Sequence, residues 1–248
     1  MQYATLSNGV ELPMIGYGTF MIKDSALCEK CVTDALETGY RLFDTAASYE
    51  NEAEIGRALR GSGLPQEAWF VTTKLWVQDA GYRAMEEAYK AGKLKAIGVC
   101  NCYPQILADI CETVEVKPAV DQVELHPFFQ QENALALMKE YGVHPEAWGP
   151  FAEGNHGIFT HPVLTQIGQK YGKSAAQVAL RWNVQRGVTV IPKSIHKERM
   201  EQNIDIWDFK LSGEDIAEIA KLDIGHSEIV DHSDPKFVQM LHSMKIHE

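Results

Sequence analysis

The sequence predicts an α/β fold of the closed (β/α)8 TIM-barrel type. Short β-branched and apolar runs alternate with amphipathic helical stretches along the whole chain, which is typical of parallel strands joined by crossover helices. The G-x-G-x-x-G fingerprint of dinucleotide-binding doubly wound sheets and the Walker lysine loop are both missing from the sequence. A barrel is therefore favoured over a doubly wound sheet. We expect one domain over residues 1–248, because no linker or low-complexity run interrupts the alternation.

An N-terminal β-hairpin is expected before the main fold. Asn8-Gly9 is a two-residue hairpin signal, and apolar segments at 4–6 and 10–12 flank it. After the hairpin, the period of apolar residues predicts only seven parallel strands, one fewer than a complete barrel contains. The predicted strands are 14–18, 40–45, 69–75, 95–100, 119–124, 143–148 and 188–192.

Helices are predicted between these strands and after the last one. Gly39, Gly92 and Gly142 directly follow three of the helices, where a left-handed residue commonly ends a helix. Ser174 is a candidate N-cap inside the longest helical stretch, which we expect to break at 172–174. The predicted helices are 24–38, 52–60, 82–91, 104–113, 132–141, 162–186, 197–203 and 212–222.

The composition excludes several classes of protein. Lys and Arg total 23 against 34 Asp and Glu, and this net charge of −11 would repel nucleic acid and anionic lipid. The sequence has no apolar run of about 18 residues that could cross a bilayer and no signal peptide. Five cysteines are too few for a disulfide scaffold. We therefore expect a cytoplasmic protein with neither nucleic acid nor a membrane as partner.

Polar residues at strand ends are the first candidates for chemistry, because barrel active sites lie at the carboxyl ends of the strands. Asp44 ends the second predicted strand, Lys74 lies at the end of the third, and Tyr49 follows in the loop after Asp44. An ammonium beside a phenol stabilises phenolate and makes proton donation easier, so the three residues form a candidate general acid for a carbonyl oxygen. The alternative is a structural ion pair beside a surface tyrosine.

A second group of candidates could bind an anion and a flat ring. Lys193, Ser194 and Arg199 concentrate donors after the last strand and suit a phosphate monoester, unless they belong to a solvated helix face. Amides near strand ends, at Asn101 and Gln122, imply hydrogen-bonded partners. Trp148 could stack on a planar ring, although such a residue is also common in packing. These candidates therefore leave two possibilities open, an anion site with a stacking surface or ordinary surface and packing roles.

Taken together, these residues resemble the aldo-keto reductase family, in particular its bacterial 2,5-diketo-gluconate reductase-like branch. Residues 39–46, with Tyr49, Glu52 and Gly56 spaced behind them, are similar to the first family signature, and residues 191–194, with Arg199 and Asn203, to the last. The resemblance implies NADPH-dependent reduction of an aldehyde or ketone to an alcohol. It also implies roles for individual residues. Tyr49 would donate the proton with Asp44 and Lys74 as partners, Asn101 and Gln122 would hold the nicotinamide carboxamide, Trp148 would stack on its ring, Gly149 and Pro150 would begin a loop over the pyrophosphate, Lys193, Ser194 and Arg199 would bind the 2′-phosphate, Gln202 and Asn203 would lie near adenine, and Phe20 and Trp76 would line the substrate pocket.

The chain departs from that family between the lysine strand and the helix at 82–91. Family members carry a further helix and strand there, and the strand ends in a catalytic histidine. Between Lys74 and Lys95 there is room for one crossover helix only. A positioned acid–base partner contributes about 10²–10⁴-fold, so reduction is expected to be weak or lost. A catalytically dead NADP(H)-binding module and a non-functional remnant are the alternatives.

Two further patterns suggest metal or redox chemistry only weakly. Cys28 and Cys31 have the spacing of a redox or zinc pair, but they lie in a predicted helix without a second pair of ligands. Glu124 and His126 lie two residues apart on a predicted strand, again without further ligands. We therefore expect no metal.

Overall fold

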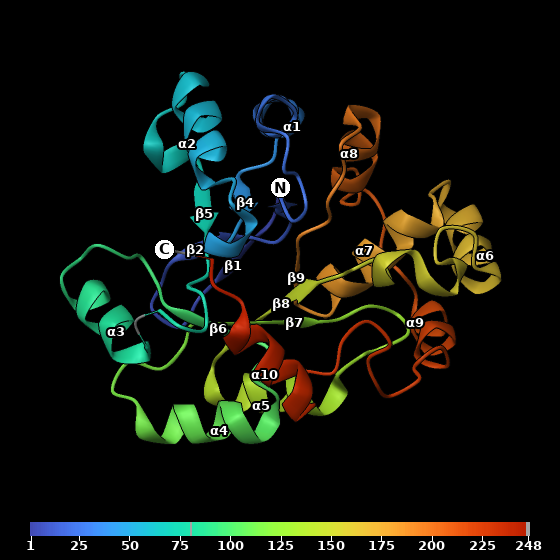
Figure 1. Ribbon diagram of the computed structural model, residues 1–248. Helices are drawn as coiled ribbons and strands as arrows, with labels where there is room; N and C mark the ends of the chain where they lie inside the picture. The colour runs from blue at the N-terminus through green and yellow to red at the C-terminus, as the bar shows by residue number, and fades with distance from the viewer. Residues whose placement is uncertain (80, 247–248) are drawn as a thin grey trace.

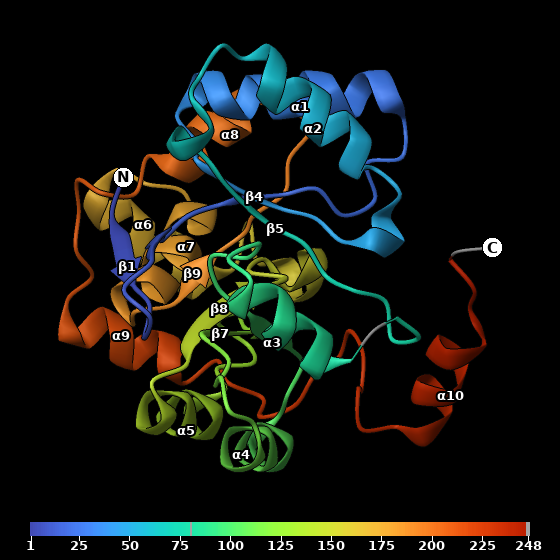
Figure 2. The same cartoon turned by 90° about the vertical axis from the view of Figure 1, so that its left-hand side faces the viewer.

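The computed structural model describes residues 1–79 and 81–246 (Figure 1). It begins with the expected hairpin, in which β1 (Tyr3–Thr5) pairs antiparallel with β2 (Glu11–Pro13). Gly9 has a φ of 81°, a left-handed conformation that a glycine adopts without strain in such a turn. The hairpin and the last helix lie at opposite ends of the molecule (Figure 2).

The expected parallel strands are all present, although each is shorter than predicted. They form two sheets, one with the order β3-β4-β5 and one with the order β6-β7-β8-β9. The strands are β3 (Tyr17–Gly18), β4 (Leu42–Asp44), β5 (Phe70–Thr72), β6 (Gly98–Cys100), β7 (Val120–Glu124), β8 (His144–Trp148) and β9 (Thr189–Val190).

The two sheets meet on one side of the barrel only. Ile15 forms a parallel bridge with Val190, and the amide of Gly18 donates to the carbonyl of Pro192. A Cβ on Gly18 would lie 2.7 Å from the carbonyl oxygen of Ile191, so glycine is what allows these segments to approach. The closed side of the barrel therefore holds the segment after β9 beside β3.

On the other side the barrel is open, since β5 and β6 are not paired in the part of the chain that the structure describes. At the hairpin end of this gap, the carbonyl of Lys95 accepts a hydrogen bond of 2.9 Å from Asn8, and its ammonium lies 5.6 Å from the ring centroid of Phe70. Strand number, tilt and shear are linked in a closed barrel. With one strand fewer than a complete barrel, the strands leave a gap here.

Helices surround the strands (Figure 1). Ser174 caps α7 as predicted and forms a capping box with Gln177, which separates the long predicted helix into α6 and α7. The sequence did not predict α10, which lies in the C-terminal tail, the segment of residues 221–246 that follows α9. The helices are α1 (Ser25–Thr38), α2 (Glu52–Gly61), α3 (Tyr82–Lys90), α4 (Pro104–Thr113), α5 (Glu132–Tyr141), α6 (Pro162–Tyr171), α7 (Ala175–Gln185), α8 (Lys197–Ile204), α9 (Gly213–Ala220) and α10 (Pro235–Ser243).

The core links the strands to the loop after β9. Tyr17 is fully buried, and its ring makes edge contacts with Tyr40 and Phe43 at centroid distances of 5.9 and 6.3 Å. Its hydroxyl donates a 2.6 Å hydrogen bond to the carbonyl of Ser194. The core thereby holds the start of the predicted phosphate-binding segment in place. Among the described residues, no helix combines the length and apolarity needed to cross a membrane.

Candidate active site

Asp44, which is buried, and Lys74, which is partly buried, form an ion pair at the carboxyl end of the barrel. The Lys74 ammonium donates to both carboxylate oxygens of Asp44 at 2.7 Å and to the carbonyl of Thr45 at 2.9 Å. Asp44 is 2% exposed and also accepts hydrogen bonds from Thr72 at 3.0 Å and Gln122 at 2.8 Å. The predicted pairing is therefore present. β5 ends at Thr72, however, so Lys74 lies in the following loop and not in the strand, as the predicted range 69–75 had it.

The pair keeps Lys74 charged in a partly buried position. Burial by itself lowers the pKa of an ammonium, but the Asp44 carboxylate opposes it, and the net shift of the Lys74 pKa is upward. A buried charge with a close, hydrogen-bonded counter-charge is tolerated, whereas an isolated one is costly. The site therefore contains a permanent cation held at a fixed position.

Tyr49 ends a short 3-10 helix at Ala47–Tyr49, directly beside this pair. The amide of Ala47 donates to the carbonyl of Lys74 at 3.0 Å, and the Lys74 ammonium lies 5.2 Å from the centroid of the Tyr49 ring. Burial raises the pKa of Tyr49, and although Lys74 opposes this effect, the net shift is upward. The Lys74 cation therefore lowers the phenol pKa as expected, but the effect of burial is larger. Near neutral pH, Tyr49 holds its proton beside a cation that can stabilise the phenolate once the proton leaves.

Asn101, Gln122 and Trp148 form a second group of candidate residues, which Gln122 connects to Asp44. The backbone N–H of Asn101 donates to the backbone carbonyl of Gln122 at 2.9 Å, and the Trp148 indole N–H donates to the Asn101 side-chain oxygen at 2.7 Å. Asn101 has a φ of 57°, a left-handed conformation that asparagine tolerates better than most residues. The structure therefore brings together the three residues to which the family resemblance gives a role at the nicotinamide ring.

Glu146 belongs to the same group and was missed by the sequence reasoning. The Gln122 amide group donates to both Asp44 and Glu146. Glu146 is 1% exposed, and its second oxygen, Oε2, has no partner among the described residues. The signal that could have found it is the two-residue period of a strand, which places Glu146 on the same face as Trp148.

The predicted phosphate-binding residues are only partly free for a ligand. Lys193 and Arg199 are exposed and form no ion pair within residues 1–79 and 81–246. The Ser194 hydroxyl accepts from the amide of His196 at 3.0 Å, so it is already used inside its own loop. Gln202 is exposed and Asn203 is buried, both on α8. Two unpaired cations therefore remain as donors for an anion.

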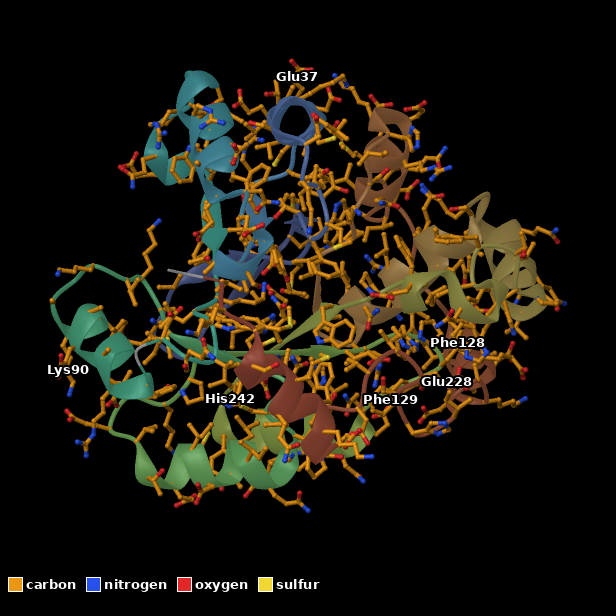
Figure 3. The ribbon with its side chains drawn as sticks, viewed as in Figure 1. Glu37, Lys90, Phe128, Phe129, Glu228 and His242 are labelled. Atoms are coloured by element: carbon orange, nitrogen blue, oxygen red, sulfur yellow. The ribbon has the colours of Figure 1, made fainter. Side chains whose placement is uncertain are left out.

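The loop that begins at Gly149 and Pro150 is strained and is tied to the C-terminal tail. Gly149 and three non-glycine residues, Ala152, Glu153 and His156, have positive φ values between 50° and 57°, which is costly for residues with a Cβ. The His156 ring lies 4.5 Å from that of Phe128 and contacts the Glu228 carboxylate at 2.5 Å. Figure 3 shows Phe128 and Glu228 close together on this side of the molecule. Opening this loop would break its contacts with the tail.

The two predicted substrate-pocket residues occupy different surroundings. Phe20 is 50% exposed, and its ring lies 5.0 Å from that of Tyr49, so it is next to the proposed acid. Trp76 lies in the loop after β5, where its indole N–H donates to the carbonyl of Met244 at 3.0 Å. The same loop contacts His242 through Gln78. The tail thus covers Trp76, as a segment that helps to form the pocket would.

The weaker patterns have structural surroundings. Cys28 and Cys31 are fully buried free thiols on α1. Glu124 accepts hydrogen bonds from His126 at 3.0 Å and from Ser227 at 2.5 Å, and so links β7 to the tail. The described residues contain no group of three or more His, Cys, Asp or Glu arranged to hold a metal.

Fold and site together define a class of protein, an oxidoreductase built on a (β/α) barrel. The aldo/keto reductase family model matches residues 14–83 and 76–224. A glyoxal reductase of Bacillus subtilis is 38% identical over 253 residues, covering 88% of this chain and 91% of its own. Among solved structures, an aldo-keto reductase from a deep-sea metagenome library has a TM-score of 0.86 at 34% identity, covering 92% of this chain and all of its own. An aldo-keto reductase complexed with NADPH has a TM-score of 0.85 at 28% identity, covering 90% and 88%.

The chain therefore belongs to the aldo/keto reductase family. The predictions of the family, the barrel fold and an oxidoreductase are confirmed. The two stretches matched by the family model meet at 76–83, where the sequence predicted the missing helix–strand unit. The alignment with the Bacillus protein is longer than the whole chain of 248 residues, so that relative contains residues with no counterpart here.

Proposed function

We propose that this chain reduces a small aldehyde or ketone to an alcohol with NADPH, and that Tyr49 is the proton donor. The observation that carries the proposal is the Asp44–Lys74 pair beside the Tyr49 phenol at the carboxyl end of the barrel. The glyoxal reductase relative indicates 1,2-dicarbonyl compounds as the first substrates to test.

The residues present fit NADPH. Lys193 and Arg199 form no ion pair among the described residues and suit the 2′-phosphate, which Arg can bind through two donors. The Gln122 amide nitrogen is held by two carboxylates, so its side-chain oxygen is the atom left to accept from a carboxamide. Trp148 is fixed by Asn101 and supplies a planar surface for stacking. NADPH, when bound, supplies the hydride for the carbonyl carbon.

The chain itself supplies the proton and the charge that stabilises its loss. The Tyr49 hydroxyl gives its proton to the carbonyl oxygen, which leaves a phenolate next to the Lys74 ammonium. Because Asp44 fixes the ammonium before reaction, little reorganisation is needed when the negative charge develops. The ring of Phe20 packs against that of Tyr49.

The gap between β5 and β6 favours a second candidate function, a module that binds NADP(H) without turnover. The strand that would carry the family histidine is missing at this position, and a positioned acid–base partner is worth about 10²–10⁴-fold. The remaining Asp44–Lys74–Tyr49 group favours weak reduction over complete loss, because it retains both the proton and the stabilising charge.

A direct assay separates the two candidates. Loss of NADPH absorbance should follow addition of glyoxal, methylglyoxal or a simple aromatic aldehyde, with formation of the alcohol checked by chromatography. Quenching of tryptophan fluorescence by NADPH without any alcohol product would support the binding module. If folded protein shows no binding of NADPH and no turnover, both candidate functions are ruled out.

Arg199→Ala should weaken NADPH binding by about 10- to 100-fold while leaving NADH binding unchanged, because a charge-assisted contact to phosphate contributes about 1.5–3 kcal/mol. Lys197→Ala is the matched control. It removes a cation from the same helix, but Lys197 is paired with Glu37 and is not part of the proposed phosphate site. Fluorescence titration with both cofactors measures the effect. If NADPH binding and NADH binding weaken equally, Arg199 acts on the fold of α8 and not on the phosphate.

A further inference from the structure

We propose that Glu146 is a positioning residue of this site, which acts through Gln122 on the Asp44–Lys74 pair and makes reduction depend on its own protonation. The proposal rests on the reductase function proposed above and adds a residue to it. Glu146 touches neither Tyr49 nor Lys74 in the hydrogen bonds of the described residues, so any effect has to pass through Gln122 or through its charge.

The geometry connects Glu146 to the ion pair in two steps. Gln122 and Glu146 are register partners on the neighbouring strands β7 and β8, and both side chains point into the barrel. The Gln122 amide nitrogen donates to Glu146 Oε1 and, at 2.8 Å, to Asp44 Oδ1. One amide group thus bridges two buried carboxyl groups, and its orientation is set by both.

Glu146 forms no ion pair within the described part of the chain. Its Oε2 atom is buried without a partner in the described residues, an arrangement that is costly for an ionised carboxylate. Burial raises the pKa of Glu146 to about 7, the Asp44 carboxylate adds to the rise, and Gln122 and Lys74 partly oppose it. His144 lies on the same face of β8, but burial lowers its pKa to about 4, so it is uncharged near neutrality.

Ionisation of Glu146 therefore changes the net charge around the proposed proton donor. Below the pKa of Glu146, this residue is neutral, and Asp44, Lys74 and Glu146 together carry no net charge. Above it, one more buried negative charge opposes formation of the Tyr49 phenolate, which carries the same sign. Carbonyl reduction should therefore slow as the pH rises through the neutral range.

The test compares the pH profile of kcat for reduction in the wild type and in Glu146→Gln. The glutamine side chain keeps an oxygen that can accept from Gln122 but cannot ionise. In the wild type, kcat should fall by about tenfold between about pH 6 and about pH 8, and in E146Q this step should disappear. The expected fall in kcat with pH has an electrostatic cause. If Glu146 had only a packing role, E146Q would lower kcat at every pH and would still show the fall between about pH 6 and about pH 8.

Asp121→Asn is the matched control. Asp121 is also fully buried, and burial raises its pKa to about 7. It is adjacent to Gln122 on β7, so its side chain points away from the barrel interior, and it accepts from the amide of Cys102. D121N should keep the pH step of the wild type. A step that survives in E146Q, or one that D121N removes, would overturn the proposal.

Infrared titration of the carboxyl band tests the coupling without any turnover. The band lost in E146Q should titrate near pH 7, and Asp44→Asn should lower its midpoint, because the Asp44 charge raises the Glu146 pKa. An unchanged midpoint would overturn the proposal even in an active enzyme. A shifted midpoint in a protein that reduces no carbonyl would instead retain the coupling and reject the proposed function.

Discussion

Replacing Tyr49 with phenylalanine should lower kcat for carbonyl reduction by at least about 100-fold, while leaving NADPH binding within about twofold of the wild type. The substitution removes one hydroxyl, which is the only proton donor that the proposed mechanism uses at the carbonyl oxygen. The ring, which packs against Phe20, remains in place. The reduction assay gives kcat, and fluorescence titration gives the affinity for NADPH.

Tyr141→Phe is a suitable control for this change. Its hydroxyl donates to Glu112 on the outer helices, so its loss removes a comparable group far from the proposed acid. Y141F should retain wild-type kcat. If Y49F is equally active, proton donation by Tyr49 is wrong, and the pair of Asp44 and Lys74 would then have only a structural role.

The parts of this site that follow from chain topology could be predicted from the sequence. Asp44 ends one strand and Lys74 follows the next, and the carboxyl ends of adjacent parallel strands lie side by side in a barrel. Their contact at 2.7 Å needed no further information. The amides of Asn101 and Gln122 were each predicted to have a hydrogen-bonded partner, and the pairing of β6 with β7 supplies one, since the backbone of Asn101 bonds to that of Gln122.

The parts that depend on burial could not be predicted. The sequence places a cation near Tyr49, but whether desolvation or the cation determines the phenol pKa depends on packing around the ring. Glu146 reads as an ordinary charged residue until β7 and β8 are in register and Gln122 turns toward it. Helix α10 was missed because the tail gives a helical pattern too short to recognise without the surface that it covers.

The missing helix–strand unit should make this chain a slower reductase than a family member that contains it. Measured side by side with the Bacillus glyoxal reductase on the same dicarbonyl substrates, kcat/KM should be lower by about 10²–10⁴-fold, the contribution of one positioned acid–base partner. The reason is the gap between β5 and β6, which leaves no strand there to carry a side chain toward Tyr49 from that wall. Purified proteins, matched by the fraction that binds NADPH, provide the comparison.

A chimera tests the cause of this difference. The first chimera contains a family helix–strand unit that ends in histidine, inserted between Lys74 and Tyr82, and its kcat/KM should rise toward that of the relative. The second contains the same unit ending in alanine. It should close the gap between β5 and β6 but leave kcat/KM unchanged. The two chimeras separate barrel closure from acid–base chemistry, because only one of them supplies the imidazole. Equal rates in the unmodified chain and the relative would show that another group has taken over the role. His232, whose ring lies 6.0 Å from that of Trp148, would be the first histidine to replace, since it approaches the site from the tail and not from the missing strand.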